Sequence, residues 1–251
     1  MNMGFVFFMT SIKTNRTWIM FCFLLFAPFF FERLFIAPFT LNREPQFIWG
    51  AIHWIYCYIA YCVVILIYLK WRKKNETKVI LKPEKHEIKW LCLTAAMSLL
   101  VKYTFDIVTV YIFSSTVIHF SLPMIYREFL WFLRAEPLWL GVGGFTMQYV
   151  YYVFEFALIA FIVDCAQKTS ERMGWSQRIP WGGIFLALTW SLMHRFGIIL
   201  PILRGEYLYS IRTILLCLVI GCSYMLPGKK PTYAFLAVMV WYWFWLLFKS
   251  K

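Results

Sequence analysis

Charged side chains are scarce in this chain. Asp, Glu, Lys and Arg make up 15% of its 251 residues, whereas an ordinary soluble domain carries roughly 25%. Hydrophobic residues make up 62% of the chain and aromatic residues 22%. So much apolar surface needs lipid as its solvent. The composition therefore excludes a soluble or secreted protein and predicts one that is embedded in a membrane.

Signatures of common catalytic and ligand-binding sites are also missing. The sequence has no His-Glu-x-x-His zinc motif, no Gly-x-Ser-x-Gly elbow and no Walker glycine loop. Its four histidines are scattered, and all but one of its seven cysteines lie inside apolar stretches. Cysteines in such positions are better explained as small apolar packing residues than as disulfide partners or ligands of a zinc knuckle. We therefore expect no metal ion and no cofactor; a metal shared by His53 and His119 is the alternative.

What the sequence does contain is a series of long apolar stretches. A helix needs roughly 20 mostly apolar residues to cross the hydrocarbon core of a bilayer. Seven stretches reach or approach that length: Trp18–Ile36, Phe47–Leu69, Trp90–Phe113, Leu138–Asp164, Trp181–Leu200, Tyr207–Leu226 and Tyr233–Phe248. They predict an all-α fold, a polytopic transmembrane helical bundle of about seven spans. Residues 1–251 are expected to form a single integral membrane domain.

Lys and Arg, which give the chain a net charge of +13, gather between the apolar stretches. The largest group is a basic loop at residues 70–89, and cationic loops are held on the cytoplasmic side during insertion. We therefore interpret it as a topology signal, with binding of anionic lipid or a protein partner as the alternative, and we expect no nucleic acid. With the N-terminus inside, fifteen cations lie on the inner side and seven on the outer side. This predicts a multi-pass protein of the cell membrane with a cytoplasmic N-terminus and an external C-terminus.

Ionisable side chains at membrane depth are costly, so each is a functional candidate until a structural partner explains it. Lys102 and Asp106 are four residues apart in one predicted span. That spacing puts both on one face of a helix and predicts an intramembrane ion pair. The alternative is a path for protons or ions.

Glu155 has no cation three or four residues away on its own helix, so its partner must come from another span. His194, in the middle part of the fifth span, is placed to supply one. In low dielectric such a carboxylate can take a proton from water while the imidazole stabilises developing charge. The same pair can also be a buried hydrogen bond between two helices, and the residues leave both interpretations open. The side chains expected to support the pair are Gln148, Tyr152, Trp190 and Arg195.

The segments Tyr152–Glu155, Ile179–Gly183 and Leu188–His194 resemble a divergent member of the CPBP family, over roughly the second half of the chain. That family includes CAAX prenyl endopeptidases and bacteriocin-processing or immunity membrane proteins. The resemblance implies an intramembrane site of glutamate and histidine that acts on or binds a membrane-associated peptide. Glu155 would match the glutamate of the first motif, and His194 the histidine of the aromatic-x-x-x-His motif.

Several motif positions of that family are filled differently here. Phe156 follows Glu155 where the family has a second glutamate, Ala160 stands at the arginine position, and the last span has no histidine. The sequence therefore allows three functions. They are a Glu/His endopeptidase, a transporter or substrate-capture protein whose cavity is lined by the interior ionisable residues, and a regulatory or immunity subunit that binds a protein partner.

Overall fold

The computed structural model describes residues 3–32, 36, 46–75, 85–113, 133, 138–193 and 207–243. All regular structure in this part of the chain is helical, without a strand. The predicted all-α helical bundle is therefore confirmed. The helices are α1 (Met3–Phe31), α3 (Gln46–Asn75), the short 3-10 helix η2 (Lys85–Glu87), α4 (Ile88–Phe113), α6 (Leu138–Arg172), α7 (Trp181–Met193), α9 (Tyr207–Tyr224) and α10 (Pro231–Trp243).

Each of the seven predicted spans falls on one of these helices. Three helices are long and apolar enough to cross a membrane, over Ile48–Lys74, Ile88–Phe105 and Leu138–Arg172. The described apolar parts of α1, α7, α9 and α10 are shorter. The basic loop begins later than predicted because residues 70–75 belong to α3, and residues 76–84 lie outside the described part.

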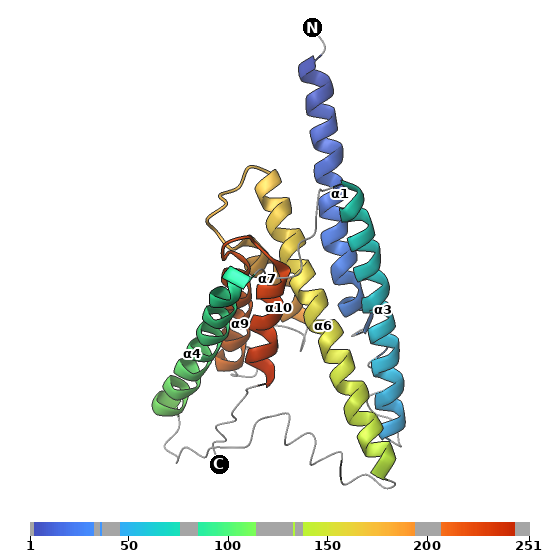
Figure 1. The fold of residues 1–251 in the computed structure, drawn as a ribbon, viewed down its shortest axis with the longest axis vertical. Helices are drawn as coiled ribbons and strands as arrows, with labels where there is room; N and C mark the ends of the chain where they lie inside the picture. Colours follow the sequence, from blue (N-terminus) through green and yellow to red (C-terminus); the bar gives the residue numbers. More distant parts are fainter. Residues whose placement is uncertain are drawn as a thin grey trace.

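Helix α6 lies at the centre of the bundle. It packs against α1 and α3 on one flank and against α7, α9 and α10 on the other (Figure 1). Helix α4 is peripheral and packs against α9 and α10. The buried residues of α6, most of which lie between Tyr151 and Ser170, therefore come close to helices from both halves of the sequence, which makes α6 the element that positions the interior polar residues.

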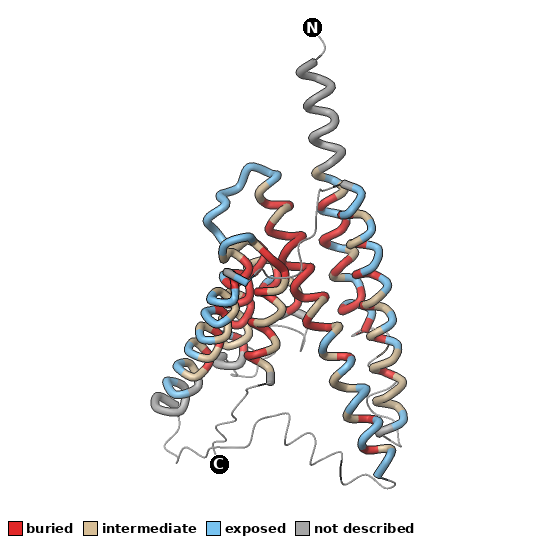
Figure 2. Tube along the Cα trace, viewed as in Figure 1, coloured by how far each residue is buried: buried red, intermediate tan, exposed pale blue. Residues whose placement is uncertain are grey.

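Many positions on the long helices are exposed (Figure 2), and large apolar side chains are among them. Phe23, Leu66 and Leu100 are each more than 60% exposed, whereas Lys102 and Asp164 are fully buried. Exposed apolar side chains on long helices are what a lipid-facing surface requires, and ionisable residues in membrane helices face the bundle interior. The bundle is therefore compatible with a membrane, in which these exposed apolar faces would meet lipid.

Two kinds of contact hold neighbouring helices. Between α1 and α3, the ring of Phe21 stacks on that of Trp71 with centroids 4.1 Å apart. Between α7 and α9, Gly183 and Gly221 face each other so closely that a Cβ added to Gly221 would lie 2.6 Å from the Gly183 Cα. Small residues allow this approach of two backbones, as in many membrane helix pairs.

Candidate functional site in the bundle interior

A polar cavity of about 220 Å³ lies between the two halves of the bundle. Two carboxyl groups, Glu32 and Glu155, and the imidazole of His53 line it together with aromatic and aliphatic side chains. The other lining residues are Trp54, Tyr151, Tyr152, Phe156, Trp190, Leu216, Val238 and Tyr242. Three ionisable groups thus meet in an otherwise mostly apolar pocket, where charge–charge interactions are stronger than in water.

Glu32 has several hydrogen-bond partners in this cavity. It directly follows α1 and is 3% exposed. Its Oε1 lies 3.3 Å from the Nε2 of His53. The hydroxyl of Tyr61 donates a short hydrogen bond to Oε2, and that of Tyr151 donates a longer one to Oε1 at 3.3 Å. Hydrogen-bond donors and an imidazole therefore fix this carboxylate in one place.

Helix α3 contributes a row of functional side chains. His53, Cys57 and Tyr61 follow one another at intervals of four residues, which places them one above another on one helix face. All three are buried, at 4%, 1% and 0% exposure. The face that carries them packs against α1 and α6, so α3 presents an imidazole, a thiol and a phenol to the interior.

Glu155 comes from α6 and is 4% exposed. One turn earlier, Tyr151 contacts Glu32, while Tyr152 accepts a hydrogen bond from the Nε2 of Gln148 at 2.6 Å. Tyr152 also packs on Tyr242 of α10, with ring centroids 4.8 Å apart. Three of the residues expected to surround Glu155 are thus placed: Tyr152 and Trp190 line the cavity and Gln148 supports Tyr152.

The predicted partner of Glu155, His194, lies outside the described residues, as does Arg195. The prediction of a Glu155/His194 pair therefore stays a prediction. The imidazole that shares a described cavity with Glu155 is that of His53, which the sequence reasoning considered only for a metal shared with His119, a residue outside the described part.

Lys102 is confirmed as a buried cation, and its ammonium lies over the ring of Tyr103 at 4.7 Å. The side chain of Asp106 lies outside the described part, so the predicted ion pair stays untested. Lys102 is not among the described residues that line the Glu155 cavity. Of the four residues expected to line the cavity of a capture protein, Glu155 lines this cavity, Lys102 does not, and Asp106 and Arg195 cannot be placed among the described side chains, so that alternative stays a prediction.

A second polar cluster, around Asp164, lies near the far end of α6. Asp164 accepts hydrogen bonds from the hydroxyls of Tyr68 (2.7 Å) and Tyr224 (2.6 Å), and Arg72 forms a short ion pair with it. These donors come from α3 and α9, so one carboxylate joins three helices. Arg72, which the sequence analysis assigned to the basic loop, is 4% exposed and belongs to this cluster.

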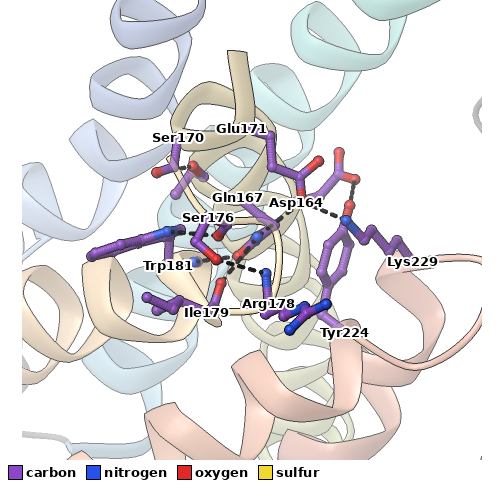
Figure 3. Close-up of polar contacts among 12 residues, drawn as sticks. Asp164, Gln167, Ser170, Glu171, Ser176, Arg178, Ile179, Trp181, Tyr224 and Lys229 are labelled. Carbon is purple, nitrogen blue, oxygen red and sulfur yellow. Dashed lines mark hydrogen bonds and ion pairs between the residues drawn. The ribbon is translucent and has the colours of Figure 1, made fainter. Parts of the chain in front are cut away.

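The same end of the bundle holds further polar contacts, drawn in Figure 3. Gln167 bridges α6 to α7: its Nε2 donates to the carbonyl of Ile179 and its Oε1 accepts from the backbone N–H of Gly182. Lys229 pairs with Glu171, and nearby Lys230 pairs with Glu87 (the latter not drawn). Every group in these contacts has a partner within the bundle, so we assign them to stability and not to chemistry.

Comparison with known family models, curated proteins and solved structures gives no match to this chain. The function must therefore be argued from the cavity and the bundle alone.

Proposed function

We propose that the chain is a multi-pass membrane protein that binds a membrane-associated peptide in the Glu32–His53–Glu155 cavity and hydrolyses it. The observation that carries this proposal is the meeting of two carboxyl groups and an imidazole, from the end of α1, from α3 and from α6, in one cavity where all three side chains are buried. Such groups, shielded from bulk water, can transfer protons and stabilise developing charge. The CPBP resemblance around Glu155 points to the same chemistry, and family membership remains part of the proposal.

The roles follow from the surroundings of each group. Glu155 is the general base that takes a proton from a water molecule in the cavity as its oxygen attacks the peptide carbonyl. It then returns this proton to the leaving nitrogen as the C–N bond breaks. His53, oriented by Glu32, stabilises the charge that develops on the attacked carbonyl. Glu32 is a positioning residue because Tyr61 and Tyr151 already donate hydrogen bonds to its carboxylate.

The size of the cavity limits the substrate. Pockets that enclose drug-sized ligands measure roughly 300–1,000 Å³, and this one measures about 220 Å³. It accommodates a side chain or a short stretch of peptide, and not a bulky solute. This favours a peptide that enters from the lipid phase over a large transported molecule.

For the topology, we propose that the end of the bundle that carries Asp164 and Lys229 faces the cytoplasm. The N-terminal ends of α4, α7 and α10 and the C-terminal ends of α3, α6 and α9 gather there (Figure 1). The basic residues at the end of α3 and between α9 and α10 lie at this end as well, as expected for a cytoplasmic face.

The test uses the full chain reconstituted in liposomes with a panel of membrane-anchored peptides that carry a fluorophore and a quencher. Loss of a general base typically costs 10²–10⁴-fold in rate, so we expect Glu155→Gln to lower cleavage at least 100-fold, and His53→Ala to lower it strongly. Glu171→Gln, a matched carboxyl-to-amide change on the same helix but outside the cavity, should cleave at the wild-type rate. If both cavity variants cleave at the wild-type rate, Glu155 and His53 take no part in the mechanism.

Absence of cleavage with retained binding would favour the non-catalytic alternative. A peptide that binds the folded state raises its unfolding temperature by mass action. If a peptide stabilises the wild type, is not cut, and no longer stabilises the Glu155→Gln variant, the cavity is a capture site of a regulatory or immunity protein.

A further inference from the structure

We propose that Glu32, His53 and Cys57 form a binding site for a divalent transition-metal ion, of which Zn²⁺ is the best match. Each residue offers one ligand atom, and the three atoms lie within 4.8 Å of one another. All three residues are buried. The sequence-based expectation of no metal rested on the absence of known zinc motifs, and this site has none of them.

The geometry of two of the ligands already suits a shared ion. Zinc binds histidine nitrogen and carboxylate oxygen at about 2.0–2.2 Å, so at a tetrahedral angle two such ligands lie roughly 3.3 Å apart. The His53 Nε2 and the Glu32 Oε1 are 3.3 Å apart. Zinc–sulfur bonds are about 2.3 Å, so a sulfur ligand lies roughly 3.5 Å from the nitrogen and oxygen ligands of the same ion. The Cys57 sulfur, within 4.8 Å of both other ligand atoms, would have to complete that approach when the ion binds.

The arrangement along the chain is also typical of a metal site. His53 and Cys57 are one helical turn apart on α3, and a spacing of four residues directs two ligands to the same point beside a helix. Glu32 reaches that point from the end of α1. Two ligands from one helix and a third from another element give a site that forms only when α1 and α3 are packed together.

The donor set selects among ions. A thiolate, an imidazole and a carboxylate suit zinc and its neighbours, whereas Mg²⁺ and Ca²⁺ prefer oxygen ligands throughout. The carboxylate of Glu32 and a thiolate of Cys57 together carry two negative charges, which a divalent ion neutralises. Charge balance matters here because an uncompensated charge is costly in the membrane interior.

Residues around the site support its ligands. Metal-bound carboxylates are commonly held by hydrogen bonds from a second layer of residues, and Tyr61 and Tyr151 donate such bonds to Glu32. Glu32 and His53 line the cavity, whereas Cys57 does not. The protein would thus supply three ligands from one side and leave the fourth position of a tetrahedral ion open towards the cavity, as in catalytic zinc sites.

This inference goes beyond the proposed function, because metal binding requires neither a peptide nor its hydrolysis. With an ion bound, Glu32 and His53 would be its ligands, so the direct contact between them and the role given to His53 above belong to the metal-free protein. The test uses purified full-length protein in detergent, stripped with a chelator and titrated with Co²⁺ as a spectroscopic probe. We expect one Co²⁺ per chain, tetrahedral d–d absorption, and a thiolate-to-cobalt charge-transfer band. Cys57→Ser should abolish that band, and His53→Ala should weaken Co²⁺ binding at least tenfold.

Cys62→Ser is the matched control, since Cys62 lies on the same helix but is not part of the ligand group; it should keep the band. Only variants that elute from gel filtration like the wild type are compared, so that unfolding is not mistaken for the loss of a metal ligand. Failure of folded wild type to take up stoichiometric Co²⁺, or persistence of the band in Cys57→Ser, would overturn the site. The Glu155→Gln variant should bind Co²⁺ as the wild type does, even if it no longer cleaves peptide. Metal binding and cleavage can therefore be tested separately.

Discussion

At the scale of single residues, α6 carries two buried carboxylates, Glu155 and Asp164, in different surroundings. Asp164 is fully buried and its partners are Tyr68, Arg72 and Tyr224, whereas Glu155 lines a cavity. Three donors from α3 and α9 engage Asp164, which therefore holds helices together, whereas Glu155 lies where a ligand in the cavity can reach it. The same residue chemistry therefore serves stability at one end of α6 and, as we propose, reaction at its middle.

Asp164→Asn should destabilise the bundle strongly. The change leaves the Arg72 guanidinium buried opposite a neutral amide, and removal of one partner of a buried ion pair typically costs about 3–5 kcal/mol. Thermal unfolding of the detergent-solubilised protein checks this. Glu171→Gln, which breaks the more exposed pair with Lys229, should cost at most about 1 kcal/mol. Equal losses in the two variants would contradict a structural role for Asp164.

At the scale of helices, the sequence predicted the elements but not their partners. The apolar stretches were sufficient to predict the seven α-helices found among the described residues, because a helix in lipid is specified by local composition. Composition could not predict that His53 lies in the same cavity as Glu155. The position of His53 depends on which faces of α1, α3 and α6 pack together. The spacing of His53, Cys57 and Tyr61 at four-residue intervals was the available signal for that face.

The polar end of α6 shows that composition alone does not predict where a helix of the bundle ends. Asp164 was predicted to end the fourth span, yet α6 continues to Arg172. The hydroxyls of Thr169 and Ser170 bond to the carbonyls of Cys165 and Ala166, and Gln167 is buried against α7. Partners on other helices, invisible in a hydropathy pattern, allow this polar stretch to remain in the bundle.

Helices α7 and α9 approach each other through glycines, which gives a prediction about packing. Gly221→Val should lower the yield and the unfolding temperature of the protein, because a side chain there collides with the backbone of Gly183 and overpacking costs about 1–3 kcal/mol or more. Gly143→Val is the control, since nothing lies within 4 Å of a Cβ at that position. Similar stability of the two variants would show that α7 and α9 are not in this contact.

The packing of α1 on α6 can be tested with the native cysteines. The sulfurs of Cys22 and Cys165 lie 3.3 Å apart, so mild oxidation in detergent should join them with only a small shift. Mass spectrometry of the digested protein would identify the linked peptides. Absence of this link, with disulfides formed instead between Cys92 and Cys222, which are exposed, would contradict the placement of α1.

At the scale of the whole molecule, the described chain is a bundle with apolar outer faces and polar interior sites. The proposed orientation places the turn between α6 and α7 in the cytoplasm. A cysteine introduced at Gln177, which is exposed, should be labelled by an impermeant maleimide only in inverted vesicles. One introduced at Leu138, exposed at the opposite end of α6, should be labelled in intact cells. The reverse pattern would show that the bundle is inserted the other way round.

The meeting of α3 and α6 side chains in one cavity is the claim on which the proposed chemistry depends. The most direct measurement is cross-linking of a His53→Cys, Glu155→Cys double variant with a short bifunctional thiol reagent, followed by mass spectrometry of linked α3 and α6 peptides. The control pair is Ile59→Cys with Glu155→Cys, because Ile59 is exposed on the outside of α3. We predict a link between positions 53 and 155 and none between positions 59 and 155; equal linking of both pairs, or linking of the control pair alone, would contradict the shared cavity.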